Sequence, residues 1–388
     1  MKNILIAAIL LAPAYAGAQQ NMKIGNLDIN PYAGVTESHD SNIYLAPNGE
    51  KAAYITRTNL GVDLVENLGS RYDLKAGYML ETINYTKDRS NNDAVHHNAS
   101  LAFTGKLPKD MTVTVDDKYK QTTDQATSDL IARALRVENN AGFKLEAPLR
   151  GDFGFALAAN HNYNNYFSKT YSMLDREEFL AGFDVSYKLQ PKTTLFAAYR
   201  YGTLNYQSGY TNDATYNNVD LGVTGKLANK LTGTVKAGMQ SRKYDKDLNN
   251  AKNTASTMQY SVQTVWMPIE KTDVTLYAKR GNVEVNYGDA RYYTTTLTDL
   301  SVSRMVRKVK VGVGVSAEHQ AYSDRQNSLV TTGKKRADDL TTARITADYN
   351  VQKWMSLNLG YFYKDRSSNI SSVKFNDSVI TLGAKLMF

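Results

Sequence analysis

The sequence predicts an all-β protein, a transmembrane, antiparallel, up-and-down β-barrel of the outer-membrane type with about 18 strands, or 16 as the alternative. Three observations predict this class. Short segments in which apolar and polar residues alternate recur along almost the whole chain. Tight turns and longer loops alternate between these segments. The chain also ends on an aromatic residue, Phe388, in an alternating segment.

The N-terminus has the features of an export signal. Met1-Lys2 is positively charged, residues 4–12 are apolar, and Ala-x-Ala patterns occur at 14–16 and 16–18. We expect cleavage after Ala18, with Ala16 as second choice. Residues 1–18 are then a signal peptide and 19–388 a single barrel domain in the cell outer membrane of a Gram-negative bacterium. A short membrane anchor is excluded by length, because a spanning helix needs about 20 apolar residues.

Composition excludes several classes of protein. The chain has no Cys, so disulfides, thiolate metal sites and a lipidated cysteine are excluded. The net charge is +8, yet Lys and Arg are spread evenly along the chain, so no nucleic-acid partner is expected. The mean hydropathy of -0.46 is compatible with a barrel, in which only alternate residues need be apolar. We interpret the charge as a mildly basic lumen and rim.

Eighteen segments have the length and composition of tilted membrane strands, since about 9 to 11 residues suffice to cross. Their expected cores are 27–38, 52–66, 71–86, 95–106, 111–122, 132–147, 152–166, 177–189, 193–207, 214–227, 231–243, 256–267, 272–286, 291–305, 309–322, 340–351, 353–366 and 373–388. The connections at 67–70, 107–110, 148–151, 190–192, 228–230, 268–271, 307–308 and 352 are tight. Those at 87–93, 123–131, 168–176, 245–255 and 324–339 are longer and richer in Asn, Asp and Ser, as expected of outer loops.

The two faces of several strands can be assigned because successive side chains point to opposite sides. In 309–317 every odd-numbered residue is apolar, and the even-numbered ones are Lys, Gly and Ser. In 340–351 the odd-numbered residues from 343 are apolar, and in 71–80 the even-numbered ones are. In 378–388 the even-numbered residues from Ile380 to Phe388 are apolar. The stretch 291–305 and the ends of several other segments carry polar residues on both faces, so their faces are not assigned.

These assignments predict a lumen lined by charges of both signs. The candidate cations are Arg57, Lys75, Arg136, Lys144, Arg200, Lys236, Arg242, Lys279, Lys310, Arg344, Lys364 and Lys385. The candidate anions are Asp63, Asp73, Glu81, Glu138, Asp184, Asp220, Glu318 and Asp348. Such a wall keeps a channel wet and hydrogen-bonds a polar polymer weakly at many points, and the same ion pairs could equally only stiffen the barrel.

Two further elements have more than one interpretation. The loop 324–339 is the longest and is locally basic, so it is a candidate to fold into the lumen, or else a solvated outer loop. Aromatic strand ends are expected to form the outer girdle, with a sugar-stacking platform as the alternative; they are Tyr163, Tyr166, Phe167, Tyr292 and Tyr293.

Catalysis and metal binding find little support in the sequence. His96 and His97 are adjacent in a strand and so point to opposite faces. The segment from Asp245 has Asp and Asn spacing like that of a calcium loop, but Asn250 replaces the Gly and Ser256 the Glu that such a loop needs. No cofactor, metal or catalytic residue is expected, and the chain is not expected to be an enzyme.

One segment carries a family resemblance. Residues 30–45, NPYAGVTESHDSNIYL, run from a strand into an Asp-Ser-Asn-Ile element, and a Thr- and Gly-bearing strand follows at 56–64. This resembles the opening of the "putative β-barrel porin 2" family, whose Tyr-alternating strands are similar to residues 195–201. The resemblance implies an outer-membrane barrel, often associated with exopolysaccharide systems. Its partners would be a polysaccharide and a periplasmic export component.

Three classes of function follow. A barrel of 16 to 18 strands leaves an aqueous channel, so the leading hypothesis is a porin-like conduit for exopolysaccharide export, with a small-solute diffusion porin as its alternative. The second is a structural or adhesive surface barrel with a closed lumen. The third is an enzyme at the rim, and a secreted β-propeller ranks lowest. Outer-membrane lipid and the barrel-assembly machinery, which reads a terminal aromatic such as Phe388, are the expected partners.

Overall fold

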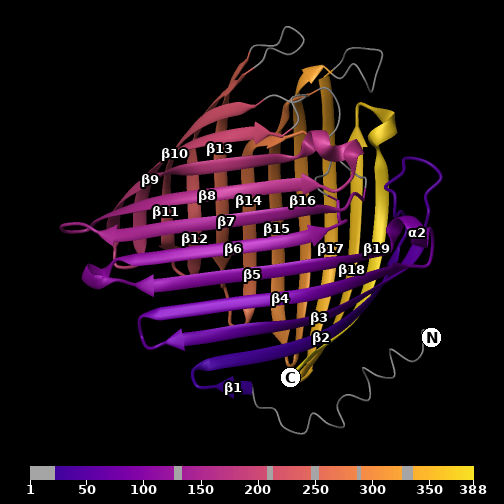
Figure 1. Ribbon diagram of the computed structural model, residues 1–388, viewed down its shortest axis with the longest axis horizontal. Helices are drawn as coiled ribbons and strands as arrows, with labels where there is room; N and C mark the ends of the chain where they lie inside the picture. Colours follow the sequence, from indigo (N-terminus) through magenta and orange to yellow (C-terminus); the bar gives the residue numbers. More distant parts are fainter. Residues whose placement is uncertain (1–21, 126–132, 208–212, 246–252, 286–289, 326–334) are drawn as a thin grey trace.

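A computed structural model describes residues 22–125, 133–207, 213–245, 253–285, 290–325 and 335–388. The expected signal peptide and cleavage sites lie outside these residues. Figure 1 shows the strands arranged side by side around a barrel. Each strand from β2 to β19 pairs antiparallel with the next, and β19 pairs with β2, so eighteen strands close the barrel.

The strands match the expected segments one for one. They are β2 (Leu27–Asp40), β3 (Ala53–Leu68), β4 (Tyr72–Tyr85), β5 (Ala94–Lys106), β6 (Thr112–Thr122), β7 (Arg136–Pro148), β8 (Phe153–Tyr166), β9 (Arg176–Gln190), β10 (Thr193–Tyr206), β11 (Ala214–Ala228), β12 (Leu231–Tyr244), β13 (Thr254–Trp266), β14 (Thr272–Glu284), β15 (Tyr292–Val306), β16 (Val309–Arg325), β17 (Lys335–Gln352), β18 (Met355–Ser368) and β19 (Phe375–Met387).

Short helices occupy some of the connections. In the long loops these are α2 (Arg89–Asn92), η3 (Lys169–Leu174) and η4 (Ser371–Val373), and in one tight turn η2 (Pro108–Asp110). Among the described residues, none of these helices is long and apolar enough to cross a bilayer.

The expected loop 324–339 is shorter than the sequence predicted. Strand β16 extends to Arg325 and β17 begins at Lys335, and Arg325 pairs with Lys335. Polar residues at 335–339 made this segment resemble a loop, but Arg336 and Asp338 are buried and paired with each other inside the barrel. The central residues of the loop, 326–334, lie outside the described part of the chain. The insertion of this loop into the lumen therefore stays a prediction.

A short first strand, β1 (Met22–Ile24), was not predicted. It forms a tight hairpin with β2, pairing Ile24 with Leu27 and Met22 with Ile29. Because β3 pairs with β2 along its whole length and β19 pairs only with residues 32–40 of β2, β1 occupies the edge of β2 that β19 leaves open.

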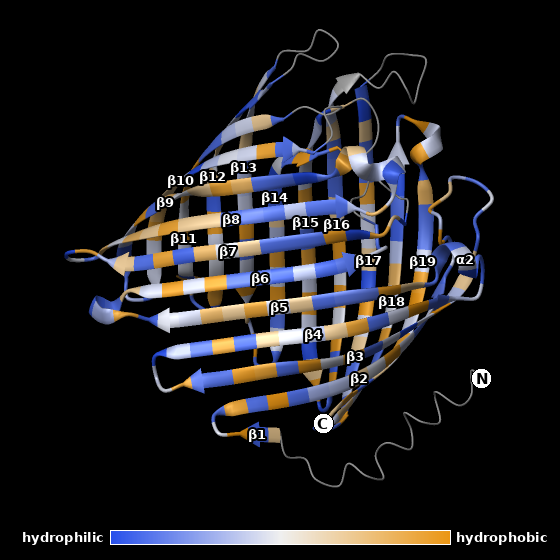
Figure 2. Cartoon of the chain, in the orientation of Figure 1, coloured by the Kyte–Doolittle hydropathy of each residue, from blue (hydrophilic) through white to orange (hydrophobic). Residues whose placement is uncertain are grey.

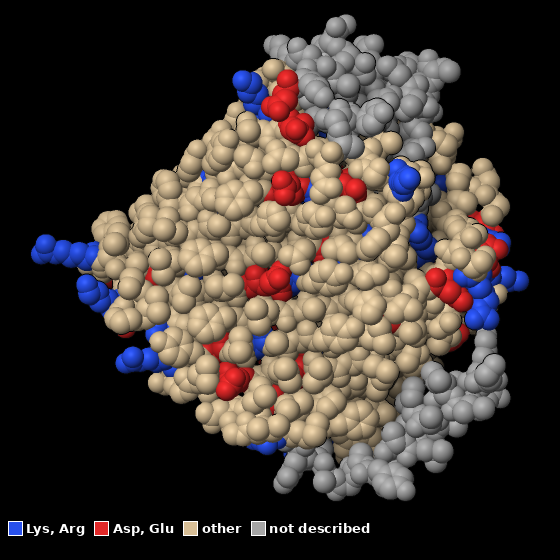
Figure 3. Space-filling view, in the orientation of Figure 1, with Lys and Arg blue, Asp and Glu red and all other residues tan. Residues whose placement is uncertain are grey.

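The outer face of the barrel is apolar. Figure 2 shows hydrophobic and hydrophilic residues alternating along the strands, and large apolar side chains such as Leu221, Ile345 and Leu382 are more than half exposed. In Figure 3 the face presented by β2 to β9 is largely uncharged, with a few isolated acidic patches. One outward carboxylate, Asp117, accepts a hydrogen bond from Asn139 Nδ2 at 2.8 Å. Such a surface fits lipid, with most polar groups turned inward.

Among the ladders that close the described barrel, the one between β13 and β14 is the shortest. It runs from Trp266 opposite Val274 to Tyr260 opposite Arg280, and within the described residues the upper part of β13, residues 254–259, has no ladder partner on β14. By contrast, β12 pairs with β13 up to Thr254, and β14 pairs with β15 up to Glu284. The wall is therefore discontinuous in its extracellular half.

Candidate functional site on the inner face of the barrel

The candidate site is the inner face, which the ladder register defines. Residues opposite one another in a ladder share a face, so Arg57, opposite Thr36 and Ile83, lies on the face away from exposed Leu60. The register places the following candidate residues on this inner face: Arg57, Lys75, Arg136, Lys144, Arg200, Lys236, Arg242, Lys279, Lys310, Arg344, Lys364, Lys385, Asp63, Asp73, Glu81, Glu138, Asp184, Asp220, Glu318 and Asp348.

Several candidates pair with one another across neighbouring strands. Arg57 Nη1 donates to Glu81 at 2.9 Å. Arg200 Nη2 lies 2.7 Å from Asp184 Oδ1. Lys236 Nζ donates to Asp220 at 3.0 Å, on the inner faces of β12 and β11. These pairs link adjacent strands and leave the wall polar.

Other partners escaped sequence reasoning. Arg344 donates to both carboxylate oxygens of Asp299 at 2.6 Å, and Asp299 lies in 291–305, a segment whose faces the alternation left unassigned. Asp124, just after β6, accepts a hydrogen bond from Arg57 Nη2 at 2.9 Å. Burial acts to raise the pKa of Asp124, but the charge and hydrogen bond of Arg57 outweigh it, and the pKa falls to about 2.

At the extracellular end, the inner face is packed with arginines and aromatic rings. Arg336 lies 4.5 Å from the ring of Tyr322, and Arg366 lies 4.9 Å from that of Phe375. Tyr166, expected in the outer girdle, is buried and lies beneath Arg136 at 5.9 Å. The girdle prediction is wrong for this residue, and also for Tyr292, which stacks on Tyr244, and for buried Tyr293. Tyr166 and Tyr293 stand on the inner face by register, whereas Tyr292 is outward by register but belongs to the end of β15 that packs against Tyr244.

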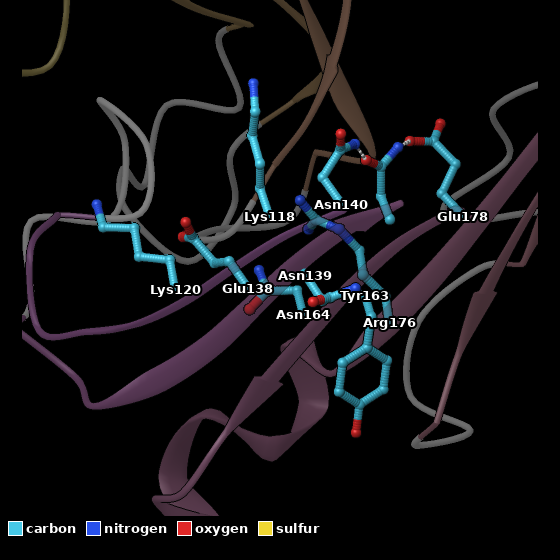
Figure 4. Close-up of a pocket in the computed structure, with 10 residues that line it drawn as sticks. Lys118, Lys120, Glu138, Asn139, Asn140, Tyr163, Asn164, Arg176 and Glu178 are labelled. Atoms are coloured by element: carbon cyan, nitrogen blue, oxygen red, sulfur yellow. Dashed lines mark hydrogen bonds between the residues drawn. The ribbon is translucent and has the colours of Figure 1, made fainter. Parts of the chain in front are cut away.

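A cavity of about 450 Å³ opens on the inner wall (Figure 4). It is lined by residues of β6 to β9: Lys118, Lys120, Glu138, Asn139, Asn140, Asn162, Tyr163, Asn164, Arg176 and Glu178. By register, the side chains of Asn139 and Tyr163 point to the outer face, and the others point inward. Its volume falls within the range of small-molecule sites. Of these residues, the sequence analysis proposed Glu138 for the lumen and Tyr163 for the outer girdle.

Two cross-strand rows build the cavity. Lys120, Glu138, Asn164 and Arg176 stand opposite one another in succession, and Lys118, Asn140, Asn162 and Glu178 form the row below. In the lower row, Asn140 Nδ2 donates to Asn162 Oδ1, and Asn162 Nδ2 donates to Glu178 Oε2 at 3.2 Å, as Figure 4 shows. The hydroxyl of Tyr216 donates to the other oxygen of Glu178 at 2.5 Å. The row is thus held in one orientation by its own hydrogen bonds.

This arrangement can recognise hydroxyl and carboxylate groups. Amides both donate and accept, as sugar hydroxyls require. Lys118 is exposed on the inner face and has no ion-pair partner among the described residues, so its ammonium group is available to an anion. A signal for this site was present in the sequence, because Asn160, Asn162 and Asn164 recur with period two in one strand.

The histidines and carboxylates of the described barrel are dispersed rather than grouped. Within the described ranges, no three His, Asp or Glu side chains are grouped so as to hold a metal ion. His96 is buried against Glu81 at 3.0 Å, while His97 faces outward and bonds Tyr78. The calcium-like segment beginning at Asp245 lies mostly outside the described residues.

A scan against family models gives one match that covers nearly the whole sequence. The model described as "Putative beta-barrel porin 2" matches residues 16–388. The chain belongs to this family. The match agrees with the resemblance seen at residues 30–45, and it extends to strands in which the sequence showed only alternation. No curated protein is detectably similar in sequence.

Solved outer-membrane barrels share the fold of this porin 2 family member. The outer membrane protein OpdK of Pseudomonas aeruginosa is 8% identical with a TM-score of 0.53, covering 93% of this chain and 99% of OpdK. OccAB3 of Acinetobacter baumannii is also 8% identical with a TM-score of 0.50, covering 94% and 100%. Family and fold together place the protein in the outer membrane, as a porin-like barrel.

Proposed function

We propose that this barrel is an outer-membrane channel for hydrophilic carbohydrate, and specifically a conduit through which an exopolysaccharide leaves the cell. The observation that carries the proposal is the polar inner wall at β6 to β9, where two rows of amides and charges surround a cavity of about 450 Å³. A polymer that must slide needs many weak polar contacts rather than one tight site. The family and the fold support a channel, and the polysaccharide is our extension of them.

The exposed Lys118 predicts that the channel prefers acidic over neutral sugars. Lys118 and Lys120 flank the amide rows on the inner face, and within the described part of the chain the ion-pair partner of Lys120 is the partly exposed Asp124, at 3.6 Å. An acidic sugar would place its carboxylate near Lys118 and its hydroxyl groups along Asn140 and Asn162. A neutral sugar of the same size would gain only the second set of contacts.

A small-solute diffusion porin is the second candidate. It is favoured by the extracellular end, where buried residues such as Arg336, Tyr322 and Phe375 pack on the inner face. A wide and smooth exit for polymer would leave such side chains exposed to water. The two candidates therefore differ in the width of the channel near its outer mouth.

Single-channel recording in planar bilayers tests the proposal. We expect a stable conductance that oligosaccharides interrupt, with acidic chains blocking at concentrations roughly 3- to 10-fold below those of neutral chains, because one screened charge contact contributes about 1 kcal/mol. The variant Lys118→Gln should remove most of this preference. Lys310→Gln, which removes an exposed inner-face lysine outside this cavity, is the matched control. A folded protein that never conducts would overturn the channel, and conductance that only small sugars enter would favour the diffusion porin.

We propose further that the protein reaches the membrane as a Gram-negative export substrate. Its signal peptide would be removed after Ala18, and the assembly machinery would recognise the last strand through Phe388. A periplasmic component would then deliver polymer to the inner mouth. Phe388→Ala should lower the amount of assembled, heat-modifiable barrel in the outer membrane without changing the amount synthesised, whereas an unchanged assembled fraction would contradict this role.

A further inference from the structure

Where the β13–β14 ladder ends, the last residues of β14 leave the barrel wall and lie on its inner side. Residues 281–285 and 290–294, the described ends of β14 and β15 with their flanking residues, are called the inner arm here. By register, Asn282 and Thr294 oppose each other on the outward face of these two strands, as do Glu284 and Tyr292. Outward residues of a barrel normally meet lipid.

These outward residues instead contact the inner face of the neighbouring wall. Asn282 Nδ2 donates to Gln240 Oε1 at 3.1 Å and to Thr257 Oγ1 at 3.0 Å, and both acceptors face the lumen. Glu284 forms an ion pair with Arg242, another inner residue of β12. The inner arm therefore lies inside the barrel, against β12 and β13.

Aromatic contacts hold the inner arm in this position. The ring of Tyr292 stacks on Tyr244 with centroids 6.1 Å apart and an interplanar angle of 7°. Arg291 lies 4.9 Å from the same Tyr244 ring. The hydroxyl of Tyr206, on β10, donates to Glu284 at 3.4 Å. Side chains of Arg242, Glu284 and Tyr244 are nearly completely buried by these contacts.

The base of the inner arm adjoins open space. Gly281 opposes inward Thr295 on β15, so a side chain at position 281 would point inward. A Cβ built there would meet no atom within 4 Å, whereas at the inward glycines Gly142 and Gly202 it would meet a neighbouring side chain at less than 3 Å. The backbone at Gly281 has no positive φ, so any residue is tolerated.

We propose that the inner arm is the constriction of this channel and determines the size of solute that passes. This inference rests on the proposed function and assigns selectivity to one element of the barrel. Polymer or solute must pass the space beside Gly281, between the inner arm and the opposite wall. The polar wall at β6 to β9 then provides contacts along the route, and the inner arm sets its width.

The absence of cysteine makes the test direct. We would introduce Gly281→Cys, refold the variant, confirm the barrel by heat-modifiable electrophoretic mobility, and record single channels before and after thiol reagents of graded size. Gln263→Cys is the matched control, because Gln263 is exposed on the inner face of the same wall, below the discontinuity. We expect large reagents at position 281 to lower conductance about two-fold or more, since the narrowest section limits flow.

Each outcome has a distinct meaning. A graded fall at position 281 together with a small change at position 263 supports the constriction. Equal small changes at both positions overturn it, even though the channel itself stands. If the unmodified variant and the parent protein are both folded and silent, the proposed function fails instead. A size cut-off for neutral polymers that is lower in Gly281→Trp than in the parent, with the fold intact, would support the assignment independently of thiol chemistry.

Discussion

Two pairs of neighbouring strands in the same barrel wall differ in how far they pair. Strands β16 and β17 pair along most of their length, whereas β13 and β14 pair over one part only. The β16–β17 ladder is unbroken from Val309 to Ala321. The β13–β14 ladder ends at Tyr260. All four strands carry alternating apolar and polar residues, but in β14 the alternation ends after Ala278.

The difference follows from what each strand would present to lipid. The outward residues of β16 from Val309 to Val315 are all valines, which are stable in lipid and allow the ladder to continue. On β14, the outward positions above Ala278 are Arg280, Asn282 and Glu284. A charged or amide group in hydrocarbon is costly. Beyond Arg280, the last residue in the β13–β14 ladder, β14 therefore turns inward, where Gln240 contacts Asn282 and Arg242 pairs with Glu284. Side-chain chemistry, rather than strand propensity, sets where this wall opens.

The largest difference between the two regions should come from proline substitutions, which remove a backbone hydrogen-bond donor. Val313→Pro removes a ladder hydrogen bond in the middle of β16 and leaves a carbonyl without a partner in lipid, at a cost of several kcal/mol. We expect almost no heat-modifiable barrel from this variant.

Met258→Pro is the counterpart on β13. The amide of Tyr244 donates to the carbonyl of Asn253, so odd-numbered residues of β13 bond β12, and the amide of Met258 points toward β14, where the ladder is missing. We expect a folded barrel that loses less than about 1 kcal/mol. Equal damage from both prolines would show that the wall is closed at Met258.

The ion pairs of the two regions give the next largest contrast. The side chains of Arg242 and Glu284 in the inner arm contact are 4% and 10% exposed, whereas those of Arg344 and Asp299 on β17 and β15 are 28% and 23% exposed. Arg242→Gln leaves the carboxylate of Glu284 buried without its charged partner, so it should lower the free energy of unfolding by about 3 kcal/mol or more. Arg344→Gln should lower it by less. Unfolding in urea from detergent micelles would measure both.

The double variant Arg242→Gln with Glu284→Gln sharpens this test. Removing both charges should restore much of the lost stability, because no uncompensated charge remains. Additive losses would mean that the two side chains do not interact, and the inner arm would then be held by Asn282 and the tyrosine stack alone.

The smallest effect is expected from a loop contact outside both regions. Asp124 has a pKa lowered to about 2 from the ordinary value of 3.8. Its pairing with Arg57 therefore contributes stability that is fully present above about pH 4 and is lost as pH falls toward about 2. Asp124→Asn should cost less than about 1 kcal/mol at pH 7, because the carboxylate is partly exposed.

The pH profile distinguishes this contact from a general acid effect. The difference in unfolding free energy between Asp124→Asn and the parent should be constant from pH 7 to about pH 4 and shrink below it. A difference that disappears near pH 6 would contradict the lowered pKa.

The strand order, strand count and the inner location of most charges follow from alternation, because period two is a direct consequence of strand geometry. The cavity does not, since it joins residues such as Lys118 and Glu178 that are far apart in the chain and meet only through register. The inner arm escaped prediction for a different reason. Outward polar residues at 282 and 284 violate the pattern, and the sequence does not show that a strand end can satisfy them by moving inside the barrel.

Strand β1 brings the two ends of the described chain close together. It lies on the same edge of β2 as β19, and the amide of Phe388 donates to the carbonyl of Pro31 at 2.9 Å, two residues beyond Ile29, the partner of Met22. The beginning and the end of the barrel thus meet at one point, so the order of strands is circular and its starting strand is arbitrary. A permuted chain that joins 388 to 22 through a short linker and opens at an extracellular loop would keep every ladder while moving Phe388 away from the terminus. Such a molecule would show whether membrane assembly depends on a terminal Phe388 or on the strand ladders alone.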